Sequence, residues 1–188
     1  DQVGADGVGL FRTEFQFLVS ETLPRLDDQV ALYRRVLDRA AGKRVIFRTV
    51  DLGGDKVLPA LNTTREENPA LGWRSIRFAL DHKGLFRRQL RALVRAAGTE
   101  PLTVMFPVVT EIEWTETRTG KRPSTLEVGV MLETPALAFS LSELAGKVDF
   151  LSVGTNDLMQ FFFAADRMTP TVSDRYDLVS PAGMRFLK

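Results

Sequence analysis

Short apolar runs alternate along the chain with longer segments whose apolar residues recur at helical spacing. Each short run is typical of a buried strand, and each longer segment is typical of an amphipathic helix. The pattern predicts strands over residues 7–11, 44–47, 102–106, 128–132 and 150–153. It predicts helical segments over residues 25–41, 73–80, 85–97, 137–144 and 158–165, with Gly42 ending the first of them.

The alternation of strand, polar strand end and helix predicts a parallel α/β fold. The strands are apolar along nearly their whole length, which indicates that both of their faces are buried. This pattern by itself fits a closed barrel or an open sheet. Residues 56–70 carry prolines, asparagines and charges and predict a long loop, and the stretch after Arg167 predicts a looped region.

One connection between predicted strands is unusual. Residues 110–125 are polar and have almost no apolar face, whereas a parallel crossover usually needs a dozen or more residues that form a helix. Either residues are missing from this connection or a bare loop replaces the helix. We favour missing residues and expect a break between Trp114 and Leu126.

Charged side chains stand where the predicted strands end. In parallel α/β folds, ligands bind at this carboxyl edge. The arginine fork suits phosphate, and carboxylates are ligands that Mg²⁺ prefers. The pattern therefore indicates a metal-assisted site for a small, highly anionic phosphate ester. A plainer alternative is that the arginines form surface ion pairs and Asp157 only caps a helix. The residues are Arg12, Arg48, Glu133, Asn156 and Asp157, with Arg167 one helix further on.

The composition is that of one soluble globular domain. Of the 188 residues, 44% are hydrophobic and 26% are charged, and the net charge of +1 gives no reason to expect nucleic acid or an anionic membrane as a partner. No apolar run is long enough to span a bilayer. Cysteine is absent, which excludes a thiolate nucleophile or metal ligand in this chain and is compatible with a reducing, cytoplasmic location.

Three other features carry less weight as functional signals. His82, the single histidine, stands among Asp81, Lys83 and Gly84 and is interpreted as a solvated turn residue. The aromatic run at residues 161–163 is interpreted as core or subunit interface. The segment at residues 53–56 has glycines but matches neither the Walker spacing nor the dinucleotide fingerprint.

Several motifs together resemble the phosphoenolpyruvate-binding barrel of the phosphoenolpyruvate–protein phosphotransferases, enzyme I of the bacterial phosphotransferase system. The amino-acid sequence of these motifs looks closest to that of the nitrogen-type paralogue. The resemblance covers almost the whole chain, and it implies a (β/α)8 TIM-type barrel domain over residues 1–188, incomplete because the first and last strands are absent. The motifs are GLFRTEF (9–15), FRTVDLGGDK (47–56), EENPALGWRSIR (66–77), MFPVV (105–109), GVMLETP (129–135) and SVGTNDLMQFFFAADR (152–167).

The resemblance also implies a site with phosphoenolpyruvate and Mg²⁺ at the carboxyl face of the barrel. Glu133 and Asp157 match the family's metal ligands, and Arg74 matches a motif arginine near the site. The positions that match its substrate-binding residues are Arg12, Arg48, Asn156, Asp157 and Arg167.

The same resemblance implies what the chain lacks. In the family, the phosphoryl acceptor is a histidine of an upstream domain and the acid is a cysteine on a later strand. Neither is present here, so we expect a fragment of a longer multidomain protein that is inactive by itself. The implied partners are phosphoenolpyruvate, a small histidine phosphocarrier protein and a second copy of the chain in a homodimer, with no nucleic acid or membrane.

Two other functions remain open at this point. The chain could be the substrate barrel of a pyruvate phosphate dikinase or a phosphoenolpyruvate synthase, which an attached nucleotide-binding domain would reveal. It could also be a non-catalytic module that senses phosphoenolpyruvate or dimerises. An upstream acceptor histidine and a downstream segment with the acid cysteine would distinguish the phosphotransferase from both.

Overall fold

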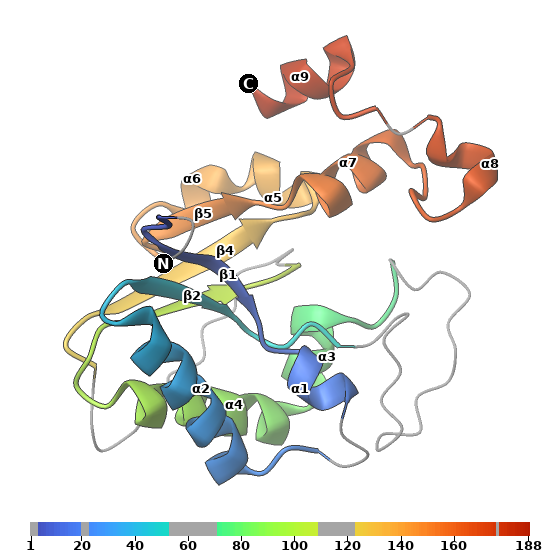
Figure 1. The fold of residues 1–188 in the computed structure, drawn as a ribbon. Coiled ribbons are helices and arrows are strands. Elements are labelled where there is room, and N and C mark those ends of the chain that lie inside the picture. The colour runs from blue at the N-terminus through green and yellow to red at the C-terminus, as the bar shows by residue number, and fades with distance from the viewer. Residues whose placement is uncertain (1–3, 20–22, 53–70, 109–122, 176) are drawn as a thin grey trace. The chain divides into compact units, whose positions relative to one another are not determined.

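The computed structural model describes residues 4–19, 23–52, 71–108, 123–175 and 177–188 (Figure 1). The chain divides into two compact units. The first comprises residues 1–107 and 114–128, and the second comprises residues 108–113 and 129–188. Each unit is described by itself.

The part of the first unit that the structure describes contains the parallel strands β1 (Gly7–Arg12), β2 (Arg44–Arg48) and β3 (Leu102–Phe106), in chain order. The register places Arg12 opposite Arg48, and Arg48 opposite Met105. Because the strands run in parallel, the two arginines stand side by side at the carboxyl edge, as the sequence predicts.

The described residues of the first unit contain four helices: α1 (Phe15–Leu18), α2 (Leu26–Ala40), α3 (Ser75–Asp81) and α4 (Lys83–Ala97). Helices α2 and α4 lie side by side (Figure 1). Their apolar faces and strands β2 and β3 form the main core, in which Tyr33, Phe47, Leu93 and Leu102 are fully buried. The helical periodicity of residues 25–41 and 85–97 is thereby explained.

Two local predictions in this unit need correction. The left-handed residue that ends α2 is Ala41, with φ of 51°, and Gly42 follows it with φ of 81°. His82 does lie at the break between α3 and α4, but it is half-buried rather than solvated. Its ring stacks on Phe78 with 4.3 Å between centroids and lies 5.0 Å from Trp73, because the turn folds it back onto these aromatic rings.

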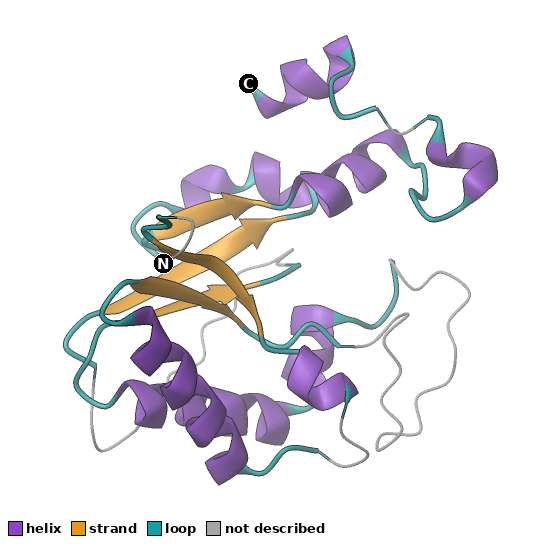
Figure 2. Cartoon of the chain, viewed as in Figure 1, coloured by secondary structure: helices purple, strands orange, loops and turns teal. Residues whose placement is uncertain are grey.

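The second unit is built on the parallel strands β4 (Leu126–Leu132, of which residues 126–128 belong to the first unit) and β5 (Phe150–Val153), with Leu132 opposite Val153. Figure 2 shows α7 (Thr155–Phe163) following β5 through a short turn. The other helices are α5 (Pro135–Phe139), α6 (Leu141–Leu144), α8 (Pro170–Ser173) and α9 (Pro181–Leu187).

Three helix predictions in the second unit are wrong in detail. The helix expected over residues 137–144 is two short helices separated at Ser140, and α7 begins at Thr155 rather than after Asp157. The sequence predicts a looped region after Arg167, but the structure has α8 and α9 there. These helices begin with a proline at the first turn, and the Ser180 hydroxyl accepts a hydrogen bond from the Gly183 amide at 3.1 Å. The start of such a short helix depends on a single proline or capping residue, so its sequence shows little helical periodicity of apolar residues.

The α/β class with consecutive parallel strands, as in an incomplete TIM-type barrel, is confirmed. The loop expected over residues 56–70 and nearly all of the unusual connection lie outside the described residues. The described end of that connection is anchored, since the Thr125 carbonyl accepts a hydrogen bond from the Leu102 amide at 2.9 Å. Within the described residues, no helix combines the length and apolarity needed to cross a membrane.

Candidate functional site

Arg48 is the last residue of β2 and is only 3% exposed. Its Nη2 atom lies 2.5 Å from Oε1 of Glu14 and 3.2 Å from Oδ2 of Asp51. Its Nε atom is buried and has no hydrogen-bond partner among the described residues. Two carboxylates hold this buried guanidinium in place, so it is a rigid cation. Its Nε–H group can donate a further hydrogen bond to an acceptor.

Asp51 joins Arg48 to a second arginine. Its Oδ2 atom lies 3.2 Å from Nη2 of Arg74, and its Oδ1 atom accepts a hydrogen bond from the Ser75 hydroxyl. Ser75 is the first residue of α3 and adopts a left-handed φ of 55°. The start of α3 is thus folded around the Asp51 carboxylate, and Arg74 is brought beside Arg48.

Arg12 is the most exposed arginine of this group, with half of its side chain accessible. Its Nε atom lies 3.6 Å from Oε1 of Glu14, the atom that also contacts Arg48. Glu14 therefore lies between the two strand-end arginines and offsets part of their mutual repulsion. Breaking a buried ion pair of this kind by removing one partner typically costs about 3–5 kcal/mol.

The sequence interpretation missed Glu14 and Asp51. Both follow a strand by two or three residues, Glu14 after β1 and Asp51 after β2. The signal was present, because each forms part of the polar stretch that follows an arginine. Only contact distances show that these acids hold the arginines rather than face solvent.

Glu133 follows β4 directly and is 4% exposed. Its Oε2 atom accepts a hydrogen bond from the Val108 amide at 2.9 Å. The rest of the side chain packs on Gly154: a β-carbon at this glycine would overlap Cγ of Glu133 and lie 3.0 Å from its Oε1. Gly154 has an ordinary φ of −84°, so glycine is needed there for space rather than for backbone freedom.

Asp157 lies in the first turn of α7, three residues after Gly154, and is 7% exposed. Its Oδ1 atom lies 2.7 Å from Nη1 of Arg167. The alternative in which Asp157 caps the helix is wrong, because Gly154 occupies the cap position. A carboxylate in the first turn is favoured by the positive end of the helix dipole, which adds to the stabilisation from Arg167.

The structure thus brings the predicted residues together in two groups. Arg12, Arg48 and Arg74 meet around Glu14 and Asp51 in the first unit, and in the second unit Glu133 packs on Gly154 while Asp157 pairs with Arg167. Asn156 is exposed at the start of α7. The expectation that Arg12, Arg48, Glu133 and Asp157 converge on one ligand involves both units and stays a prediction.

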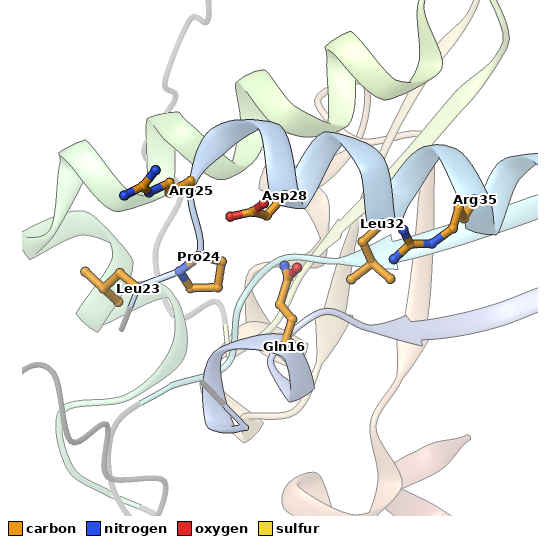
Figure 3. Close-up of a pocket in the computed structure, with 7 residues that line it drawn as sticks. All are labelled: Gln16, Leu23, Pro24, Arg25, Asp28, Leu32 and Arg35. Carbon is orange, nitrogen blue, oxygen red and sulfur yellow. The ribbon is translucent and has the colours of Figure 1, made fainter. Parts of the chain in front are cut away.

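A separate hollow of about 300 Å³ lies at the N-terminal half of α2 (Figure 3). Gln16, Leu32, Arg25 and Arg35 are among its lining residues. The arginines are exposed, and none of the predicted site residues contributes to the lining of this hollow among the residues described. The strand ends remain the candidate site.

Parallel strands that carry arginines and buried carboxylates at their carboxyl edge define a parallel α/β domain of the barrel class. The chain belongs to the family described as PEP-utilising enzyme, PEP-binding domain, whose model matches residues 1–188. This confirms the family resemblance and the α/β barrel class.

The curated relatives make the similarity more specific. Over 98% of its length the chain is 42% identical to the phosphoenolpyruvate-protein phosphotransferases of Staphylococcus carnosus and Bacillus subtilis, covering 35% of each. Over 99% of its length it is 43% identical to a multiphosphoryl transfer protein of Rhodobacter capsulatus, covering 24% of that protein. The chain therefore spans about a quarter to a third of these relatives. The S. carnosus match extends over 201 aligned positions, more than the 188 residues of this chain.

Proposed function

We propose that residues 1–188 form the phosphoenolpyruvate- and Mg²⁺-binding domain of a phosphoenolpyruvate–protein phosphotransferase, as one part of a longer multidomain protein. Support comes from the family match over the whole chain and from the names of its relatives. The observation that carries the proposal is the Arg48 guanidinium, buried at a strand end with Nε free of described partners.

In this proposal the phosphoryl group of phosphoenolpyruvate is bound by the strand-end arginines. Arg48 supplies a preorganised donor, and the half-exposed Arg12 supplies a solvent-accessible one. Phosphoryl transfer involves little covalent chemistry for the protein, so catalysis rests on positioning and on stabilising spread negative charge. Glu14 and Asp51 keep the arginines fixed, which lowers the reorganisation needed when substrate binds.

Glu133 and Asp157 are the residues that would hold Mg²⁺. Both are buried carboxylates, and the space over Gly154 accommodates the Glu133 side chain beside the start of α7. Among the described residues, no group of three or more acidic, histidine or cysteine side chains could hold a metal. Mg²⁺ usually takes one or two protein carboxylates and completes its octahedron with water and substrate oxygens, so Glu133 and Asp157 are the expected protein ligands. When bound, the metal neutralises charge on the phosphate and on the departing enolate oxygen. Arg167 balances Asp157 and adds a further cation.

The remaining parts of the proposal rest on the resemblance of the sequence motifs to the phosphotransferase family. The phosphoryl group passes from phosphoenolpyruvate to a histidine of an upstream domain and then to a small histidine phosphocarrier protein. The functional protein is a cytoplasmic homodimer. The relatives are named phosphotransferases, which favours this function over a pyruvate phosphate dikinase or phosphoenolpyruvate synthase.

Titration calorimetry tests the binding proposal. We expect Mg²⁺ and phosphoenolpyruvate to enhance each other's binding to the protein by about tenfold or more. The reason is that oxygens of phosphoenolpyruvate would complete the coordination shell of a Mg²⁺ ion held by two protein carboxylates. The enhancement should be equal in both directions, as thermodynamic linkage requires. The variant Glu133→Gln, which keeps size but loses the charge, should abolish the enhancement. Independent binding of metal and phosphoenolpyruvate would contradict a metal shared between them.

A second prediction concerns Gly154. In Gly154→Ala the new methyl group overlaps Cγ of Glu133 and displaces its carboxylate. We expect Mg²⁺-dependent binding of phosphoenolpyruvate to weaken by about 10–100-fold, the usual cost of disturbing the support of a metal ligand. The matched control is Gly84→Ala on α4, where a methyl group meets no atom within 4 Å. Normal metal dependence in Gly154→Ala would show that the Glu133 position is not needed for the metal.

A further inference from the structure

One buried polar side chain of the first unit has no role in the proposed chemistry. Gln89 lies on α4 and is 0% exposed, and the other buried residues of this helix are apolar, among them Leu85, Ala92 and Leu93. Burying a primary amide is unfavourable unless its oxygen and both of its hydrogens find partners. A glutamine at this position therefore needs an explanation in terms of what it contacts.

All of the hydrogen-bonding groups of the Gln89 side chain are used. Its Oε1 atom accepts a hydrogen bond from the Val50 amide at 2.9 Å. Its Nε2 atom donates to Oγ1 of Thr13 at 2.8 Å and to the Tyr33 hydroxyl at 3.3 Å. A complete set of partners with fixed geometry makes such a side chain a rigid connection rather than a mobile one.

These partners lead to the strand ends. Thr13 follows β1, and its hydroxyl donates to the Arg48 carbonyl at 2.8 Å. Val50 lies between Arg48 and Asp51, and the intervening Thr49 donates its amide to the Met105 carbonyl at 2.8 Å. Gln89 therefore fixes the backbone after β2 at two points, reaching Arg48 through Thr13 and holding Val50 directly.

We propose that Gln89 is a positioning residue for Arg48: through Thr13 and Val50 it holds the turn that presents the Arg48 guanidinium and its partner Asp51. The inference rests on the proposed function of Arg48 in binding phosphoenolpyruvate. A shift of about 1 Å in a substrate-positioning group can cost as much as about 100-fold in activity, so the support of the backbone at Arg48 has a measurable consequence.

The chain offers a matched control in Gln29, a second buried glutamine in the same network. Its Nε2 atom donates to the Pro24 carbonyl at 3.1 Å, and its Oε1 atom accepts from the Tyr33 hydroxyl at 3.4 Å. Burial raises the pKa of Tyr33 to about 12, so this hydroxyl keeps its proton at neutral pH and connects the two glutamines. Gln29 thus resembles Gln89 in burial and chemistry, but its own hydrogen bonds go to Pro24 and Tyr33, and it reaches the strand ends only indirectly, through Tyr33 and Gln89.

The experiment compares Gln89→Met with Gln29→Met in the full-length protein, because methionine keeps the volume and removes the hydrogen bonds. Calorimetry with phosphoenolpyruvate and Mg²⁺ measures affinity, and thermal unfolding measures stability. We expect both variants to lower the melting temperature. We expect only Gln89→Met to weaken phosphoenolpyruvate binding, by about 10–100-fold, with Gln29→Met within about twofold of wild type. Equal weakening by both variants would overturn the proposal.

A double variant separates positioning from general destabilisation. If Gln89 acts through Arg48, adding Gln89→Met to Arg48→Ala should weaken binding by less than about twofold further. Additive losses would overturn the positioning role. The failure of the proposed function is distinct from this failure. It would show as unchanged binding in Arg48→Ala alone, whereas weakened binding in Arg48→Ala with normal binding in Gln89→Met contradicts only the role of Gln89.

Thr13 supplies a second pair of variants if Gln89→Met does not fold. Thr13→Val keeps the shape and removes the hydroxyl that connects Gln89 to the Arg48 carbonyl, whereas Thr13→Ser keeps the hydroxyl. We expect Thr13→Val to weaken phosphoenolpyruvate binding by about tenfold and Thr13→Ser to restore it to within about threefold of wild type. Equal affinities of the two variants would overturn the proposal.

Discussion

Replacing Arg48 with alanine in the full-length protein should lower the rate of phosphoryl transfer from phosphoenolpyruvate by about 10³-fold or more, the scale of removing an arginine that stabilises the transition state. The reason is structural as well as electrostatic. Arg48 is the buried member of the arginine group, fixed by Glu14 and Asp51, so the more exposed Arg12 cannot take its place at equal cost. Rapid-quench kinetics with labelled phosphoenolpyruvate and the phosphocarrier protein measure the transfer.

Two further variants control this result. Arg44→Ala removes an arginine from the opposite end of β2, where it pairs with Glu127 near the surface, and should leave transfer within about twofold. Arg48→Lys keeps a positive charge beside Glu14 and Asp51 but loses the planar fork, so we expect a loss of about 10²-fold or more with a smaller cost in stability. If Arg48→Ala transferred the phosphoryl group at nearly the wild-type rate, the assignment of Arg48 to the phosphoenolpyruvate site would be wrong.

A protein consisting of residues 1–188 alone should bind phosphoenolpyruvate and yet never become phosphorylated. Transfer requires a bound phosphoryl group, an acceptor in line with it and an acid that protonates the enolate. The only histidine, His82, stacks between α3 and α4 on Phe78, with its Nδ1 atom 3.1 Å from the Phe78 carbonyl. The 188 residues contain no cysteine. Incubation with labelled phosphoenolpyruvate and Mg²⁺, followed by gel autoradiography under alkaline conditions, measures phosphohistidine.

The matching experiment supplies the missing groups. Adding an upstream domain with the acceptor histidine and the downstream segment with the acid cysteine should restore labelling and transfer to the phosphocarrier. His82→Asn should leave the activity of that longer protein within about twofold. Label found on His82 in the short protein would contradict this interpretation, because it would place an acceptor inside the chain itself.

Much of the fold could be predicted because its signals are local. Each of the five strands is a short apolar run, and the observed strands match the predicted ones to within two residues. The long helices α2 and α4 have strong periodicity, because one face of each is buried in the core. Helices α8 and α9 were not predicted. A helix of one or two turns begins at a proline or a capping hydroxyl and is too short to show a helical periodicity of apolar residues.

The sequence also determined which residues stand at the strand ends, because a residue that directly follows a strand lies at the carboxyl edge wherever that strand packs. Arg12, Arg48 and Glu133 were found in this way, and Asp157 was found in the polar segment that follows β5. Their partners follow from tertiary structure: Glu14 with two arginines, Asp51 with Ser75 and Arg74, and Glu133 against Gly154. Gln89, 39 positions from Val50 and 76 from Thr13, gave no sequence signal. Hydrogen bonds and close packing depend on distances of a few tenths of an ångström between segments far apart in the chain, which only the folded structure fixes.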